Sequence, residues 1–181
     1  MDPRAAVNHE FVDDSARVEP GDEVALIPPV SGGGPKSDEL QGELVRIQEG
    51  DFSIDETLAL VKGETKGIGG VCIFLGTSRD NSKGKEVEKL EFEHYPGMAE
   101  AKLLEIRTRA LKDFDIVEIS IIHRFGVIPA GENIVLIVVG AAHRDAAFRA
   151  CRFAIDELKE ITPIWKKEIM PSGEFWVEAH P

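Results

Sequence analysis

The sequence is poor in the features that mark metal sites, disulfide frameworks and membrane spans. It has only two cysteines, Cys72 and Cys151, and neither belongs to a Cys-x-x-Cys pair. A zinc site or a disulfide framework is therefore not expected, and a reducing cytoplasm fits the chain. No apolar run approaches the ~20 residues that a membrane-spanning helix needs, and the N-terminus lacks the apolar segment of a signal peptide.

Positive charge is also scarce. The chain carries 21 lysines and arginines against 33 aspartates and glutamates, which gives a formal net charge of −12. Nucleic acid is not expected as a partner, because phosphate binding needs a broad basic surface. Phosphate-loop, dinucleotide, zinc and catalytic-triad motifs are absent as well.

Regular apolar patterning is what the chain does have. Apolar residues make up 43% of its 181 residues, enough for one folded domain of ordinary size. Helices are expected from a Ser53 cap to Lys62, after Gly97, and from His143 to Pro163. Short strand connections favour an α+β domain with a mixed, largely antiparallel sheet and two main helices. The expected strands lie over residues 4–12, 23–27, 42–47, 71–75, 90–94, 117–124, 134–139 and 175–177.

Basic residues gather in one stretch of this acidic chain. His143 and Arg144 follow the buried strand expected over 134–139 and precede a helix that Asp145 is expected to cap. Imidazole and guanidinium groups beside a helix N-terminus suit oxyanions, and this predicts a site for an anionic small molecule. The core-facing positions of the helix are predicted to be Ala147, Cys151, Ala154, Ile155 and Leu158.

Lysines follow at the far end of the same helix. Lys159 falls in its last predicted turn, before Pro163 stops the helix. Lys166 and Lys167 come next, in an extended segment. Arg79 lies in a loop after the strand expected over 71–75.

Each of these residues also has a structural interpretation. His143 and Arg144 would equally suit a helix cap with a surface ion pair. Lys159 could complement the helix dipole, and Lys166 could guard a strand edge. Arg79 alone is more typical of a solvated surface residue.

The N-terminal segment has a distinct composition. Asp22 to Gly33, with the sequence Asp-Glu-Val-Ala-Leu-Ile-Pro-Pro-Val-Ser-Gly-Gly, resembles the C-terminal tail of the ubiquitin-like sulfur-carrier subunit of molybdopterin synthase. In that family the tail ends at its Gly-Gly, whose carboxylate becomes a thiocarboxylate. Here Gly32 and Gly33 are followed by Gly34, and the first half of the ubiquitin-like (β-grasp) fold is missing. We therefore expect a truncated carrier-like tail over 1–33, a linker over 34–42 and a catalytic domain over 43–181.

Residues 43–181 resemble the catalytic large subunit of molybdopterin synthase. The resemblance rests on motifs that follow one another in order along nearly the whole segment. They are Phe74-Leu75-Gly76 with Arg79, Leu90 to Met98, Ile122 to Gly126, Ala142-His143-Arg144 with Ala147-Phe148, Leu158-Lys159, Pro163 to Glu168, and Trp176 to Ala179.

The resemblance implies insertion of sulfur into cyclic pyranopterin monophosphate to form the dithiolene of molybdopterin. It also implies a homodimer within a heterotetramer, with one carrier subunit on each large subunit and neither metal nor cofactor. By position, Lys159 and Lys166 match the active-site lysines. The other matches are to substrate-binding groups, namely Arg79, His143, Arg144 and Lys167, and to Phe74 in the pocket wall.

The resemblance also implies that His143 and Arg144 reach the neighbouring subunit's site. The sequence departs from some relatives at His180, where they have arginine. The alternatives to a molybdopterin synthase are a non-catalytic anion-binding or scaffold subunit, and another sulfur- or acyl-transfer enzyme with the same basic pocket.

Overall fold

Two separate units make up the chain in the computed structural model, Met1–Ser37 and Asp38–Pro181. The structure describes residues 4–7, 10–12, 17, 24–27, 39–82, 84–161, 163–171 and 173–177. Gly32, Gly33 and His180 therefore lie outside the described residues. Within those ranges, none of the helices has the length and apolar character needed to cross a membrane.

The first unit contains a three-stranded antiparallel sheet in the order β2-β1-β3. Its strands are β1 (Arg4–Val7), β2 (Glu10–Val12) and β3 (Val24–Ile27). The prediction of one strand over 4–12 is wrong, because this segment forms two strands that pair with each other. The sequence signal for the break is Asn8, a residue type favoured in turns.

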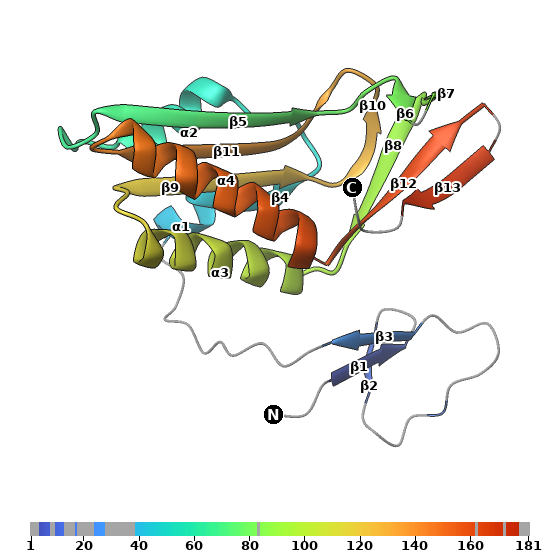
Figure 1. Ribbon diagram of the computed structural model, residues 1–181. Helices are drawn as coiled ribbons and strands as arrows, with labels where there is room; N and C mark the ends of the chain where they lie inside the picture. The colour runs from blue at the N-terminus through green and yellow to red at the C-terminus, as the bar shows by residue number, and fades with distance from the viewer. Residues whose placement is uncertain are drawn as a thin grey trace. The chain divides into compact units, whose positions relative to one another are not determined.

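Two four-stranded sheets form the second unit (Figure 1). The first has the order β4-β9-β11-β5 and comprises β4 (Val45–Gln48), β9 (Glu118–Arg124), β11 (Asn133–Ala141) and β5 (Gly70–Thr77). The second has the order β10-β8-β12-β13 and comprises β10 (Gly126–Pro129), β8 (Lys89–His94), β12 (Ile164–Met170) and β13 (Gly173–Val177). A small hairpin joins β6 (Asn81–Ser82) to β7 (Lys85–Glu86).

These sheets confirm the α+β class. Among the described pairings of this unit, β4 with β9 is parallel and the others are antiparallel. The expected single sheet is in fact two, which meet where the chain passes from β9 through Phe125 into β10. β10 was not anticipated from the sequence.

Helices cover both faces of the first sheet (Figure 1). The two long helices, α3 (Met98–Asp113) and α4 (Arg144–Ile161), pack on one face, and α2 (Ile54–Lys62) packs on the other. The apolar row of α3 is confirmed, because Leu103, Ile106 and Ala110 have no solvent exposure. The Ser53 cap is confirmed as well, since the Glu56 N–H donates to Ser53 Oγ at 3.2 Å.

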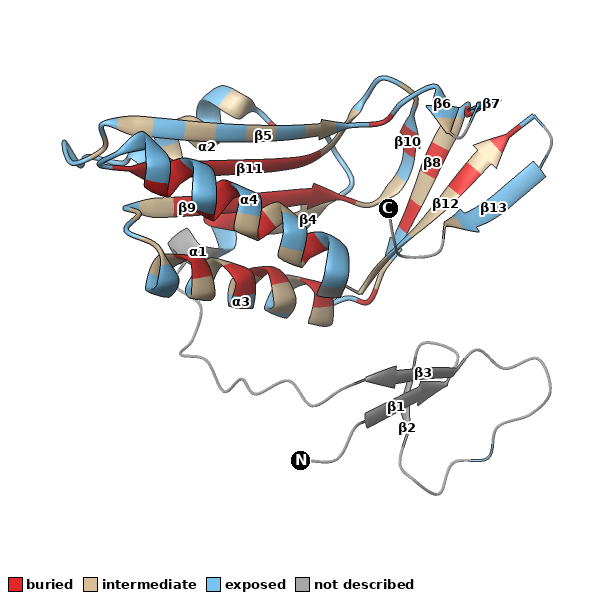
Figure 2. Cartoon of the chain, in the orientation of Figure 1, coloured by how far each residue is buried: buried red, intermediate tan, exposed pale blue. Residues whose placement is uncertain are grey.

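Three local predictions need correction. Residues 42–44 are not strand: they end a short helix, α1 (Glu39–Leu44), whose Leu44 packs with Phe52 under α2. Asp145 lies inside α4 rather than at its cap, and its carboxylate accepts from Arg149 Nε at 2.9 Å. β5 is not a buried strand, because it lies at a sheet edge and exposes alternate residues (Figure 2).

Candidate functional site

Lys166 is held in place by a buried carboxylate. It lies on β12 opposite Phe92 of β8, so the two side chains share the inner face of the second sheet. Its Nζ is 3.1 Å from Glu168 Oε1, and Glu168 is only 7% exposed. The ion pair therefore fixes the position of the ammonium group on β12.

Lys159 is seven residues before Lys166 in the sequence. It is exposed in the last turn of α4, and the chain then passes through Pro163 into β12. The Tyr95 N–H donates to the Pro163 carbonyl at 3.2 Å, which anchors this crossing to the end of β8. Lys159 and Lys166 are thus carried by elements that meet at the end of the second unit formed by its second sheet.

Arg79 reaches the same end from the first sheet. It is exposed in the loop after β5, between Ser78 and Asp80. The Ser78 N–H donates to Glu132 O at 2.8 Å, and the Val87 N–H donates to Asp80 O at 2.8 Å. These bonds tie the loop to the segments that lead into β11 and β8.

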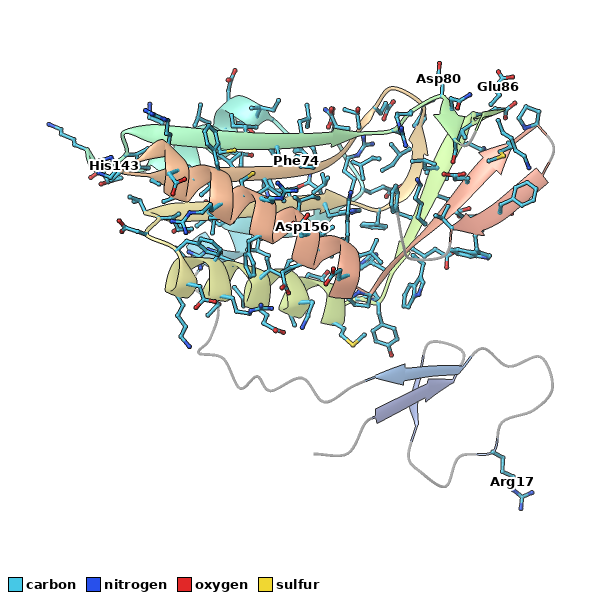
Figure 3. All side chains as sticks on the ribbon, viewed as in Figure 1. Arg17, Phe74, Asp80, Glu86, His143 and Asp156 are labelled. Carbon is cyan, nitrogen blue, oxygen red and sulfur yellow. The ribbon has the colours of Figure 1, made fainter. Side chains whose placement is uncertain are left out.

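His143 and Arg144 lie at the opposite end. They stand exposed at the start of α4, beside Gly70 at the start of β5, where an added Cβ would be 3.4 Å from Arg144 Cα. Figure 3 shows His143 at one end of the unit and Asp80, the neighbour of Arg79, at the other. Lys159 is sixteen residues after His143, which corresponds to about 24 Å of helix. The expected gathering of these cations into one site therefore does not occur within a single copy of the chain.

Phe74 lies on the face of β5 that α4 covers. Its half-buried ring packs against the core formed by α3, α4 and the sheet. A Cβ on Gly76 would lie 3.3 Å from the Phe74 ring and 2.6 Å from Val135 Cγ1, so glycine at this position leaves room for the ring.

Lys167 points away from Lys166, because consecutive strand residues face opposite sides. Its Nζ is 3.1 Å from Glu91 Oε2 and 3.8 Å from both Glu93 and Glu174, and it lies 4.7 Å from the centre of the Trp176 ring. The hydrogen bond to Glu91 raises the pKa of Lys167, and the charges of the three carboxylates add to the rise. This placement favours a structural role over the predicted contact with substrate.

The two cysteines lie in contact, as free thiols. Burial raises the pKa of Cys151 to about 12, and contact with Cys72 adds to the rise. A protonated, enclosed thiol agrees with the interpretation of Cys151 as a core residue. In the described part of the chain, no group of three or more His, Cys, Asp or Glu side chains could hold a metal ion.

No role for Glu168 was predicted from the sequence, although it lies in the Pro163 to Glu168 motif. The signal that could have shown its role is its position two residues after Lys166, since residues i and i+2 of a strand share a face. A glutamate two residues after a functional lysine can therefore pair with it.

Comparison with known proteins decides the family. Residues 47–161 match the model of the MoaE protein family. The chain belongs to the MoaE family. Residues 3–33 match the ThiS family, which agrees with the resemblance of the N-terminal tail to a sulfur carrier.

Relatives of this MoaE-family chain are named molybdopterin synthase catalytic subunits. One from Pyrococcus abyssi is 47% identical over 129 residues, which is 71% of this chain and 86% of the relative. One from Haemophilus influenzae is 46% identical over 135 residues, which is 75% of this chain and 89% of the relative. The crystal structure of molybdopterin synthase from Staphylococcus aureus matches with a TM-score of 0.71 and 35% identity. The match covers 75% of this chain and 97% of the Staphylococcus aureus chain. The chain is accordingly an enzyme of molybdenum cofactor biosynthesis, as the sequence resemblance implied.

Proposed function

We propose that the catalytic domain over residues 43–181 transfers sulfur from a thiocarboxylated carrier protein to cyclic pyranopterin monophosphate, forming the dithiolene of molybdopterin. The observation that carries this proposal is the match to the MoaE family, together with relatives named as the catalytic subunit of molybdopterin synthase. The free thiols of Cys72 and Cys151 suit the reducing cytoplasm as the place of this reaction.

Lys159 and Lys166 are the proposed catalytic residues. Their elements converge at one end of the unit, and Lys166 is oriented by Glu168. Ammonium groups there can stabilise the charge that develops as sulfur adds to the pterin and can transfer protons. Arg79 approaches from the β5 loop, and its guanidinium suits the substrate phosphate. Phe74 is the proposed wall of the pocket.

A second copy of the chain would complete this site. His143 and Arg144 match substrate-binding groups of the family but lie about 24 Å of helix away from Lys159. We propose that they act in the site of the neighbouring subunit, within a homodimer. This arrangement reconciles their role with their distance from the lysines.

The sulfur donor is proposed to be a separate, full-length ubiquitin-like carrier ending in Gly-Gly. Residues 3–33 match the ThiS family, and Gly33 is joined to Gly34 by an amide. Because Gly33 is in amide linkage, it has no free carboxylate that could be converted to a thiocarboxylate. We propose that residues 1–33 are a carrier-like tail and residues 34–42 a linker.

Lysine variants test the proposed chemistry. Lys159→Ala should abolish turnover of the pyranopterin with added thiocarboxylated carrier. It should change the free energy of unfolding by less than about 0.5 kcal/mol, because Lys159 is exposed. Lys166→Arg keeps a cation beside Glu168 and should still be severely impaired, since a guanidinium stays protonated at neutral pH and does not serve as a general acid or base.

The controls separate this proposal from its alternatives. Arg79→Ala and Arg144→Ala should mainly raise KM, each losing roughly 1.5–3 kcal/mol of charge-assisted hydrogen bonding. Wild-type rates in both lysine variants would remove these residues from catalysis. A wild-type chain that binds the pterin but never converts it would point to a scaffold subunit.

A further inference from the structure

A hairpin that follows Arg79 brings a further cation to the second sheet. Its two short strands, β6 and β7, pair Ser82 with Lys85. The Gly84 N–H donates to Asn81 Oδ1 at 3.1 Å, and Gly84 has a φ of 79°, which glycine adopts at little cost. The hairpin therefore holds Lys85 in a fixed place relative to the loop that carries Arg79.

The side chain of Lys85 faces the second sheet. Its Nζ lies 5.4 Å from the centre of the Phe175 ring on β13. Val87, two residues further along, is only 2% exposed and packs in an apolar core with residues of β8, β10 and β12. Figure 3 shows Glu86, which stands between Lys85 and Val87, pointing away from these strands. The alternation along the hairpin thus agrees with the contact between Lys85 and Phe175.

Phe175 connects Lys85 with the proposed catalytic lysine of β12. In the register of β12 and β13, Phe175 lies directly opposite Glu168, so the two side chains share the inner face of the sheet. Glu168 Oε1 is 3.1 Å from Lys166 Nζ on the same face. Phe175 and Glu168 therefore lie between Lys85 and Lys166.

The charge of Lys85 is available for a ligand. Among the residues that the structure describes, Lys85 forms no ion pair, whereas Lys166 pairs with Glu168 and Lys167 with Glu91. Its neighbour Phe175 is 45% exposed. Contact between an ammonium group and an exposed aromatic ring is weak, so an anion would be a stronger partner for Lys85.

We propose that Lys85 binds the phosphate of the pterin substrate, together with Arg79. The inference rests on the proposed function, because it assigns a further binding group for the same substrate. Both cations belong to one loop and its hairpin, and guanidinium and ammonium groups are the usual protein ligands of phosphate. Phe175 offers a flat apolar surface beside Lys85 for the rings of the substrate.

The substrate phosphate fits this position better than the thiocarboxylate of the carrier. The thiocarboxylate has to reach the carbon atoms that receive sulfur, beside Lys159 and Lys166. Lys85 is separated from Lys166 by Glu168 and Phe175, so it suits an anionic group that does not receive sulfur. The phosphate is such a group, because sulfur adds to carbon.

Equilibrium binding of the pyranopterin to the full chain, without carrier, tests the proposal. Lys85→Gln removes the charge, keeps much of the apolar stem and should raise Kd roughly tenfold. Lys85→Arg keeps the cation and should bind within about threefold of the wild-type chain. Lys112→Gln is the matched control, because it removes an exposed lysine from the last turn of α3, and it should leave Kd unchanged.

Inorganic phosphate identifies the group that Lys85 binds. It should compete with the pyranopterin for the wild-type chain, and its inhibition constant should rise in Lys85→Gln. An unchanged Kd for the pyranopterin in Lys85→Gln, or an unchanged inhibition constant for phosphate, would overturn the proposal. A raised KM for the carrier with an unchanged Kd for the pyranopterin would overturn it too, since Lys85 would then contact the carrier.

A purely structural contact between Lys85 and Phe175 predicts a different result. Phe175→Leu removes the ring and leaves the charge of Lys85, so pyranopterin binding should weaken less than in Lys85→Gln. Equal losses of Tm in the two variants, with Kd unchanged in both, would show that Lys85 only covers the ring, and the proposal would fall.

These binding measurements do not depend on sulfur transfer. If Lys85→Gln weakens binding but the wild-type chain never converts the pterin with thiocarboxylated carrier, the role of Lys85 stands and the proposed reaction falls. If the wild-type chain converts the pterin and Lys85→Gln keeps the wild-type Kd, the reaction stands and the role of Lys85 falls. A wild-type chain that neither binds nor converts the pterin would overturn both.

Discussion

His123 lies where the two sheets meet, and its burial makes stability depend on pH. Its ring packs edge-on against Phe92 with ring centres 5.3 Å apart, and its Nδ1–H donates to Arg124 O at 2.6 Å. The pKa of His123 is lowered to about 4, mainly by burial. The hydrogen bond to Arg124 opposes the shift, and the nearby His94 contributes to it. His123 is therefore neutral in the folded chain at neutral pH.

The sign of the resulting effect follows from proton binding. Between the ordinary histidine pKa of about 6.5 and the folded value, the unfolded chain binds a proton that the folded chain does not. The free energy of unfolding should fall as pH drops through this window, by about 3 kcal/mol from His123 alone. Urea unfolding at pH 7 and pH 4 measures the loss. His123→Gln, which does not titrate, should show a shallower decrease; identical slopes would contradict the assignment.

Lys167 shows how one residue can tie several strands together. Its ammonium group on β12 contacts Glu91 and Glu93 of β8, Glu174 of β13 and the ring of Trp176. Lys167→Gln should lower Tm by a few degrees, because the carboxylates then repel one another without a cation between them. KM should stay at its wild-type value. A raised KM with an unchanged Tm would instead support the substrate contact that the sequence predicted.

At the scale of the whole molecule, two impaired variants should complement each other when turnover is measured at a substrate concentration below the KM of Arg144→Ala. Arg144→Ala and Lys159→Ala each damage both sites of their own homodimers. A mixed dimer would contain one site with neither substitution if the site is shared between copies. Random mixing should restore roughly a quarter of wild-type activity for a two-fold dimer. No recovery in dimers shown by mass to be mixed would contradict a shared site.

The N-terminal unit gives a second prediction at this scale. Deleting residues 1–35 should leave turnover with added carrier unchanged or raised. A tethered carrier-like tail that binds in the carrier's groove would compete at an effective concentration of about a millimolar. Turnover at several carrier concentrations separates relief of competition from no effect. A deletion that abolishes activity while the dimer stays folded would reveal a positive role for the tail.

Local patterns in the sequence were enough for much of the fold. The helical spacing of Leu103, Ile106 and Ala110, the Ser53 cap and the apolar run before His143 each predicted an element that is present. These features depend on neighbours within a few residues, where spacing decides which side chains share a face. The motifs around Arg79, Lys159 and Lys166 likewise pointed to the family without a structure.

Only the tertiary structure decided which residues come together. Strand order places β5 at an edge and leaves Ile73 exposed, although the run from Val71 to Leu75 is as apolar as a buried strand. The path of α4 separates Arg144 from Lys159, and the pleat of β12 gives Lys166 a different face from Lys167. Strand order and helix path arise from contacts between residues far apart in the chain, which short-range spacing does not encode.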